Sequence, residues 1–123
     1  MPPISALGRH LLVEVYGCDK KVLQDVARVK STMLRAARAT KTTVLNSMFH
    51  TFDSKGVTGV VLIAQSHLSV HTWPEYGYAS VDIYACGGKA DPWSAIDVLL
   101  KGFKARKADT RELKRPRGGR LTA

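Results

Sequence analysis

The stretch VTGVVLIAQSHLSVHTWPEYGYASVDIYACG, residues 57–87, decides the fold of this 123-residue chain. Residues 57–64 form an apolar, Val-rich run that is typical of a buried strand. Residues 67–73 and 77–87 alternate polar and apolar side chains with a period of two, which is typical of half-buried strands. The intervening PEYG favours a tight connection, so these last two segments are predicted to pair antiparallel.

Further strands are predicted on both sides of this stretch. Residues 9–16 are rich in β-forming side chains and end at a glycine. Residues 42–52 form another expected strand, with Val44, Met48 and Phe52 on one face. Residues 108–115 are a candidate for a last edge strand.

Two amphipathic helices are predicted. The first follows Asp19 as its N-cap and spans residues 20–39, because apolar residues recur there at steps of three and four: Val22, Val26, Val29, Met33 and Ala37. The second begins at Asp91 and Pro92, an N-cap and first-turn pair. Its expected apolar face consists of Trp93, Ile96, Leu99, Leu100 and Phe103.

These elements predict an α+β fold: a mostly antiparallel β-sheet with two helices packed on one face, a two-layer sandwich. The expected strands carry polar residues among apolar ones, namely Ser66, Ser69, Ser80 and Asp82. The second face of the sheet is therefore expected to be mixed and covered by a second copy, giving a homodimer with an αββα arrangement. The chain is expected to be a single domain, residues 1–123, with a disordered tail at 115–123.

Composition narrows the classes of function. Nine Lys and Arg against two acidic residues lie between Lys101 and Arg120, so a net charge of +7 out of the formal +9 belongs to the C-terminal region. Phe103 is the one aromatic residue in this region and belongs to the expected apolar helix face, so the charges carry no aromatic side chains for stacking on bases, which argues against nucleic-acid binding as the main function. Cys18 and Cys86 form neither a disulfide framework nor zinc-ligand spacing. With neither a signal pattern nor a membrane-length apolar run, a cytoplasmic protein without membrane or metal partners is expected.

Ser66 directly follows the apolar run, and His67, His71 and Cys86 come after it. Taken singly, such residues are more often structural than catalytic. A Ser–His hydrolase is disfavoured because the sequence lacks a G-x-S-x-G motif. A serine hydroxyl near its own preceding carbonyl permits a different reaction, attack on the peptide bond before it.

Residues 57–87 closely resemble the core of the bacterial and archaeal S-adenosylmethionine decarboxylases. The usual pattern there is E-S-H-[ILT]-x-[IV]-H-T-[WY]-P-E, followed by G-Y and, further on, T-C-G. The likeness extends to LGRHLLVEVYGCD near the N-terminus, FHTF at 49–52 and DPW at 91–93, and covers residues 7 to about 107.

The resemblance implies a proenzyme that cuts itself. Ser66 would attack the carbonyl of Gln65, and elimination would leave a β chain of residues 1–65 and an α chain of residues 66–123. Ser66 would become a pyruvoyl cofactor that forms a Schiff base with the substrate. His71 would assist the processing, with support from the Thr58 hydroxyl.

The same resemblance assigns residues to the substrate. Cys86 would be the proton donor, Phe52 would stack on the adenine, and Glu75 would accept hydrogen bonds from the ribose. Trp73 is a weaker candidate for contact with the substrate. The implied activity is decarboxylation of S-adenosylmethionine to S-adenosyl 3-(methylthio)propylamine, for spermidine biosynthesis. His50, His67, Tyr78 and Asp82 have no assigned role, and Cys18 is expected to be structural.

Gln65 departs from the family pattern, which has Glu at this position. Cleavage uses the backbone carbonyl of residue 65, so processing is still expected, with a rate or substrate choice that differs. Two alternatives stay open: a pyruvoyl-dependent L-ornithine or L-arginine decarboxylase, and an unprocessed, non-catalytic paralogue.

Overall fold

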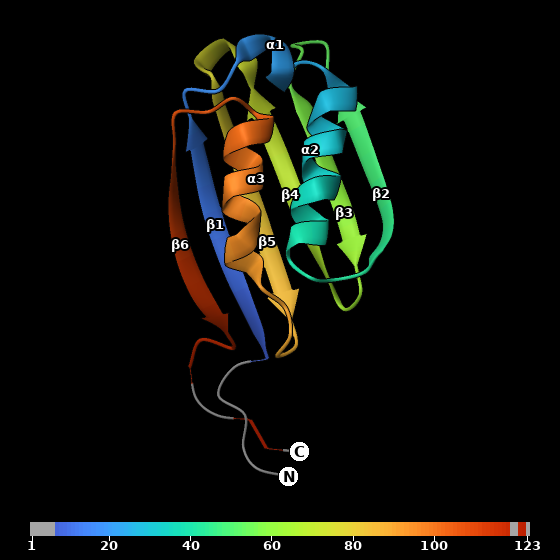
Figure 1. Ribbon diagram of the computed structural model, residues 1–123, viewed down its shortest axis with the longest axis vertical. Helices are drawn as coiled ribbons and strands as arrows, with labels where there is room; N and C mark the ends of the chain where they lie inside the picture. Colours follow the sequence, from blue (N-terminus) through green and yellow to red (C-terminus); the bar gives the residue numbers. More distant parts are fainter. Residues whose placement is uncertain (1–6, 119–120, 123) are drawn as a thin grey trace.

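The computed structural model describes residues 7–118 and 121–122. Its centre is a six-stranded sheet in the order β2-β3-β4-β5-β1-β6, and every neighbouring pair is antiparallel (Figure 1). The strands are β1 (Gly8–Tyr16), β2 (Val44–Thr51), β3 (Val57–Ile63), β4 (Ser66–Trp73), β5 (Tyr78–Cys86) and β6 (Lys107–Arg115). The predicted strands are therefore confirmed, including the edge strand predicted at residues 108–115, which spans Lys107–Arg115.

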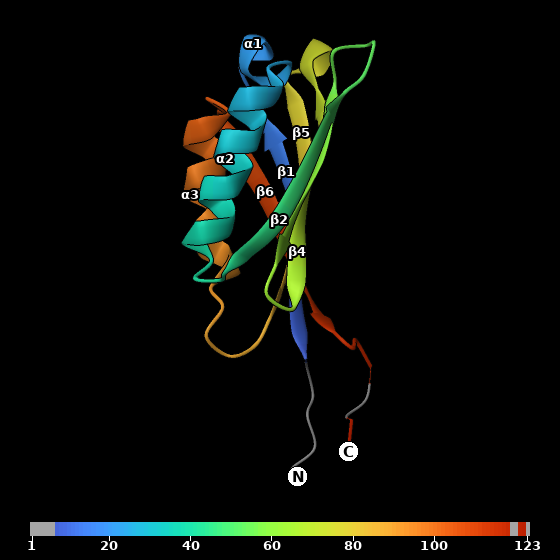
Figure 2. The same ribbon diagram turned by 90° about the vertical axis from the view of Figure 1, so that its right-hand side faces the viewer.

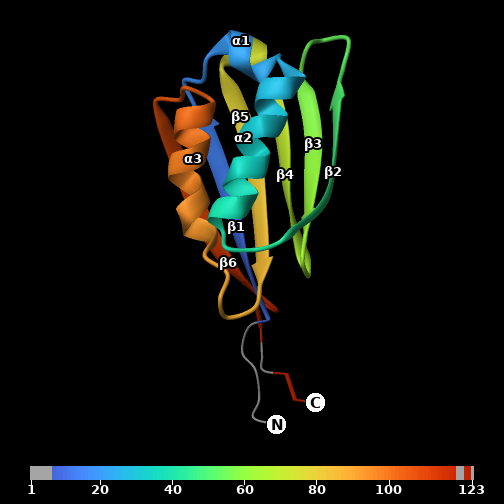
Figure 3. The ribbon, with the colours of Figure 1, turned by 45° about the vertical axis from the view of Figure 1, so that its right-hand side comes forward.

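The α-helices lie on one face of this sheet, as the edge-on view in Figure 2 shows. They are α1 (Lys20–Leu23), α2 (Val26–Ala39) and α3 (Ala95–Gly102). Two short 3₁₀ turns, η1 (Pro74–Tyr76) and η2 (Pro92–Ser94), follow β4 and precede α3, respectively. Helix α2 packs on β2, β3 and β4, and α3 lies beside it and contacts β6 (Figure 3). The α+β, two-layer prediction is confirmed.

The core lies between the helices and the sheet. Alternate strand residues point into it, as the period of two predicted. Those at most 1% exposed include Leu11, Val13, Val15, Val61, Ile63, Leu68, Val70, Val81 and Ile83, facing Val29, Met33, Leu99 and Phe103 from the helices. This apolar contact fixes which strand residues point away from the helices.

Those residues form what we call the open face, because Figure 2 shows no α-helix covering that side of the sheet. The strand register places on it His10, Leu12, Glu14, Met48, His50, Thr58, Val60, Leu62, His67, Ser69, His71, Trp73, Tyr78, Ser80, Asp82, Tyr84 and Cys86. The open face is mixed in polarity, as predicted. Ser66 is not part of it: this side chain points to the helix side with Leu68 and Val70, which corrects its predicted placement.

The predicted helix at 20–39 is interrupted. The Asp25 carboxylate accepts hydrogen bonds from the backbone N–H groups of Ala27 and Arg28, at 3.1 and 3.4 Å, and so caps a new helix. Such a cap competes with continuation of the preceding turn. As a result Val26 is 37% exposed instead of lying on the apolar face.

Two side-chain orientations also differ from the prediction. A register shift between Val44 and Asn46 places Val44 and Met48 on opposite faces of β2, and Phe52 follows the strand. The extra residue of a bulge breaks the period-two pattern. Trp93 is 45% exposed, and its Nε1 donates a hydrogen bond to Glu112 at 2.7 Å instead of joining the apolar face.

None of the described helices is both long enough and apolar enough to cross a membrane. The predicted disordered tail, residues 115–123, falls partly on residues 119, 120 and 123, which lie outside the described residues.

Candidate active site

The hairpin between β3 and β4 presents Ser66. Ile63 pairs with Ser66, so the connecting loop consists of only Ala64 and Gln65. Gln65 is exposed and has a φ of 69°, in the left-handed region. The Ser66 side chain is 8% exposed, and its Oγ is the one buried side-chain N or O atom of the described residues with no hydrogen-bond partner. Leaving such a hydroxyl unpaired costs about 1–3 kcal/mol, which calls for an explanation.

Cys86 ends β5 at the same end of the sheet as Ser66. His67 pairs with Tyr84, so one step further along both strands brings the backbone of Ser66 level with Ala85, next to Cys86, although the Ser66 and Cys86 side chains point to opposite faces of the sheet. Cys86 is half-buried and has no disulfide partner. We call the group of Gln65, Ser66 and Cys86 the cleavage end.

Cys18 lies in a different environment. Burial raises the pKa of its thiol to about 11, and Sγ lies 3.6 Å from the carbonyl oxygen of Val15. A thiol that stays protonated and packed in this way is inert at neutral pH. The structure therefore supports a structural role for Cys18.

Thr58 and His71 face each other across β3 and β4. The two residues are a register pair, and Thr58 Oγ1 lies 3.0 Å from His71 Nδ1. A hydrogen bond here fixes the orientation of the imidazole ring and leaves its Nε2 free to exchange a proton. The structure thus brings together the two residues that the sequence assigned to processing.

Phe52 lies beside this pair. It is 49% exposed, and its ring meets the His50 ring edge-on with centroids 4.7 Å apart. A hollow of about 280 Å³ lies over β2, β3 and β4 here, lined by Met48, His50, Phe52, Thr58, Gly59, Val60, Ser69 and His71. Its mostly apolar lining with a few polar side chains is the composition expected of a small-molecule site.

Glu75 and Trp73 lie at the far end of β4. Glu75 is exposed in η1, directly after the strand. The Trp73 ring stacks on Tyr78 with centroids 5.3 Å apart, and burial together with the hydrogen bond to Glu14 raises the pKa of Tyr78 to about 12. We call the group of Phe52, Thr58, His71, Trp73 and Glu75 the binding end.

The cleavage end and the binding end are separated within one chain. Ser66 is the first residue of β4, and His71 lies five residues further along this strand. At a rise of about 3.3 Å per residue, the two Cα atoms are roughly 16 Å apart. Glu75 lies further still, so one chain does not bring all the candidate residues into contact.

A polar network on the open face joins three strands and was not anticipated. His10 Nε2 lies 3.1 Å from one carboxylate oxygen of Asp82, and Ser69 Oγ donates to the other at 3.2 Å. The Tyr84 ring contacts both His10 and His67, with centroids 5.6 and 5.9 Å away. The only signal in the sequence was that these residues occupy alternate strand positions.

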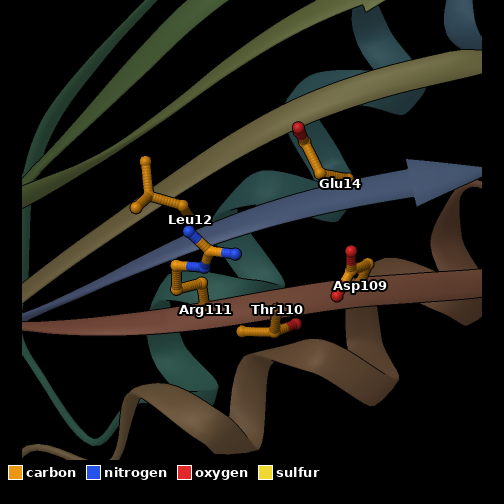
Figure 4. Close-up of a pocket in the computed structure, with 5 residues that line it drawn as sticks. All are labelled: Leu12, Glu14, Asp109, Thr110 and Arg111. Carbon is orange, nitrogen blue, oxygen red and sulfur yellow. The ribbon is translucent and has the colours of Figure 1, made fainter.

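A larger hollow contains neither Ser66 nor the pair of Thr58 and His71. It measures about 560 Å³ and lies over β1 and β6, lined by Leu12, Glu14, Asp109, Thr110 and Arg111. Figure 4 shows Arg111 extending from β6 toward Leu12, while Thr110 points the other way. Because it holds neither the serine nor the histidine pair, we place the candidate site at the smaller hollow and the hairpin. Among the described residues, His, Cys, Asp and Glu side chains form no group of three or more suited to a metal ion.

Fold and site together define a small two-layer α+β protein with an unpartnered serine at a β-hairpin. The sequence model of the family described as S-adenosylmethionine decarboxylase matches residues 9–116. The S-adenosylmethionine decarboxylase proenzyme of Caldanaerobacter subterraneus subsp. tengcongensis is 46% identical over 112 residues, which cover 91% of this chain and 90% of that protein. The proenzyme of the same description from Fervidobacterium nodosum is 49% identical over 105 residues, or 85% of this chain and 77% of that protein.

A solved structure agrees with these sequence matches. The crystal structure of the adenosylmethionine decarboxylase from Aquifex aeolicus superposes with a TM-score of 0.81 and 34% sequence identity, covering 89% of this chain and 91% of that chain. The chain therefore belongs to the S-adenosylmethionine decarboxylase family.

Proposed function

We propose that this protein is a pyruvoyl-dependent decarboxylase of S-adenosyl-L-methionine that first cuts itself between Gln65 and Ser66. One observation carries the proposal beyond family membership. The Ser66 hydroxyl directly follows a two-residue loop and is buried without a partner, next to the carbonyl that it is proposed to attack. A structural serine at such a position is normally hydrogen-bonded, whereas a nucleophile has to be free to move.

The first step of self-cleavage is an N-to-O acyl shift. Ser66 Oγ forms a bond to the Gln65 carbonyl carbon, the C–N bond breaks, and the hydroxyl proton ends on the freed Ser66 nitrogen. Loss of the Ser66 α-proton then expels the Gln65 carboxylate. Water displaces the nitrogen as ammonia, which leaves a pyruvoyl group at the start of an α chain of residues 66–123 and frees a β chain of residues 1–65.

His71 is the proposed base for the elimination. The hydrogen bond between His71 Nδ1 and Thr58 Oγ1 orients the imidazole ring, and Nε2 can then accept the α-proton of Ser66. Thr58 has a β-branched side chain with restricted χ1, so this orientation is held more firmly than a serine would hold it.

The residues present fit a pyruvoyl group at position 66. Its chemistry is that of an electron sink, which takes up the electrons released when the substrate carboxylate leaves. The first residues of β4 remain paired with β5 after a cut, so the group stays anchored beside Cys86. Cys86 is proposed to return a proton to the substrate α carbon, because a positioned thiol can act as a general acid.

The binding end is proposed to hold the adenosyl part of the substrate. The exposed Phe52 face offers a stacking surface for adenine, and the Glu75 carboxylate offers acceptors for the ribose hydroxyls. Trp73 is proposed to lie near the sulfonium, a cation that an aromatic face holds by about 0.5–2 kcal/mol.

Because the two ends are roughly 16 Å apart along one strand, we further propose a homodimer in which each site combines the cleavage end of one copy with the binding end of the other. The open face supports this arrangement, since Met48 is 74%, Leu62 48% and Val60 41% exposed there. Two open faces packed together give the αββα arrangement and cover this apolar surface.

Mixed dimers test the shared site. Two inactive variants, Ser66→Ala and His71→Ala, are unfolded together and refolded in equal amounts. Half of the dimers are then mixed, and one of their two sites has both residues intact, so roughly a quarter of the wild-type activity is expected. If each site lay within one chain, the mixture would stay as inactive as the two variants, which would contradict the shared site.

A substrate comparison separates the proposal from its alternative within the family. Carbon dioxide release is expected from carboxyl-labelled S-adenosylmethionine and not from ornithine or arginine, which have no adenosine for Phe52 and Glu75 to bind. Glu75→Ala is expected to raise KM for S-adenosylmethionine about 10- to 100-fold with kcat little changed, because a hydrogen bond to a charged group contributes about 1.5–3 kcal/mol. Release from an amino acid alone would contradict the substrate assignment.

A further inference from the structure

We propose that the backbone of Gln65 drives self-cleavage, because the hairpin holds this residue in a strained left-handed conformation that cleavage releases. The inference rests on the proposed self-cleavage and adds to it a residue that acts through its φ angle. Gln65 acts here as a positioning residue, since its side chain takes no part in the reaction.

The loop between β3 and β4 holds the backbone of Gln65 in an unfavourable conformation. Its φ is 69°, whereas Ala64 does not have a positive φ. This is the pattern of a type II turn, which calls for Gly or Asn at its third position and whose twist fits a two-residue hairpin poorly. In the left-handed region, a residue with a Cβ has a higher free energy than in the right-handed region. The difference corresponds to a change of about five- to thirtyfold in a rate constant.

The surrounding structure prevents the loop from relaxing. The ladder pairs Ile63 with Ser66 immediately outside the loop and Leu62 with His67 one step further. The Ala64 N–H also donates to the Thr43 carbonyl at 2.8 Å, which ties the loop to the start of β2. Strain of this kind persists only where its neighbours fix it on all sides.

The acyl shift loosens this constraint. In the precursor, one atom, the Ser66 nitrogen, joins the Gln65 carbonyl carbon to the Ser66 Cα. In the ester, the connection runs through Oγ and Cβ and is one atom longer, so Gln65 can leave the left-handed region while β3 and β4 stay paired. The strain therefore raises the energy of the precursor and not that of the ester.

The other strained residues show why cleavage is confined to this loop. Among the described residues with side chains, Lys41, Lys55 and Lys104 also have positive φ. Lys55 and Lys104 precede Gly56 and Ala105, which have no nucleophile. Lys41 precedes Thr42, whose hydroxyl is hydrogen-bonded to Thr40 and the Ala37 carbonyl. Of these four described residues, only Gln65 precedes a buried hydroxyl without a hydrogen-bond partner.

The test follows cleavage of freshly refolded precursor by intact mass over time in three variants. Gln65→Gly is expected to be cut about five- to thirtyfold more slowly than wild type, because glycine adopts this φ without strain. Gln65→Asn is expected to lie between the two, since Asn tolerates the left-handed region better than Gln. Gln65→Ala keeps the Cβ and loses the amide, so it is expected to be cut at the wild-type rate.

Stability measurements connect the rate to the strain. In the uncut Ser66→Ala background, Gln65→Gly is expected to raise the equilibrium constant for folding, in urea titrations, by the same factor by which it slows cleavage. Lys55→Gly is the matched control, because Lys55 has a φ of 76° in the loop between β2 and β3. It is expected to stabilise the Ser66→Ala protein similarly and to leave the cleavage rate unchanged.

Three outcomes would overturn the inference. One is a Gln65→Gly protein that is stabilised yet cut at the wild-type rate, and another is an Ala variant that is slowed as much as the Gly variant, which would assign the effect to the amide side chain. The third is a Lys55→Gly protein that is slowed equally. A wild-type chain that is never cut would instead overturn the proposed self-cleavage itself, so the two failures are distinguishable.

Discussion

A Ser66→Ala variant is expected to remain one uncut chain of 13.5 kDa and to release no carbon dioxide from S-adenosylmethionine. Alanine removes the nucleophile that forms the ester, so neither the cut nor the pyruvoyl group can arise. The effect on activity is therefore complete loss. Intact mass spectrometry of the purified protein measures the first outcome, and release of labelled carbon dioxide measures the second.

In this variant, loss of activity through misfolding has to be distinguished from loss of the nucleophile. The Ser66 hydroxyl has no hydrogen-bond partner, so its removal is expected to leave the fold intact or slightly more stable. Ser31→Ala, on the exposed surface of α2, is a matched control that should be cut like wild type, into fragments that meet between residues 65 and 66. A folded Ser66→Ala protein that still splits there, or still releases carbon dioxide, would rule out the mechanism. A wild-type chain that stays whole would support the non-catalytic alternative.

A Cys86→Ala variant is expected to be cut normally and to decarboxylate about 10²- to 10⁴-fold more slowly, the range typical of a lost general acid. The reason is that Cys86 is proposed to act only after maturation, when the substrate α carbon needs a proton. Comparing the extent of cleavage by mass with kcat on the same sample separates these two stages.

Cys18→Ala is the matched control for Cys86. Burial raises the pKa of Cys18 to about 11, so its thiol plays no acid–base role near neutral pH, and kcat is expected to be unchanged. Cys86→Ser should recover only part of the activity, because a hydroxyl is a weaker acid than a thiol. Wild-type turnover by Cys86→Ala would mean that another group returns the proton.

Much of the architecture follows from local sequence pattern. The alternation in β4 and β5 places Leu68, Val70, Val81 and Ile83 in the core and the residues between them on the open face. Those patterns need only the period of a strand and the hydrophobic effect. The pairing of Thr58 with His71 places side by side two residues to which the family motif assigns a part in processing, and those roles stay predictions.

Other features depend on interactions that a linear pattern does not contain. The Asp25 cap divides the predicted helix, and the shift after Val44 turns that residue to the other face of β2. Ser66 was expected on the mixed face and instead points toward the helices. Ser66 and His71 are also only five residues apart in the sequence, but an extended strand places their Cα atoms roughly 16 Å apart.

The sheet order β2-β3-β4-β5-β1-β6 also determines how the two fragments of a cut molecule would be held together. Cleavage after Gln65 assigns β1, β2 and β3 to one fragment and β4, β5 and β6 to the other. Strand β1 of the first fragment lies between β5 and β6 of the second, and β3 pairs with β4, so the two fragments are interleaved. They can separate only by global unfolding of the sheet. A cut molecule that unfolds would have to bring two separate chains together again, whereas the precursor folds as one chain. The proposed cleavage would therefore make refolding depend on protein concentration.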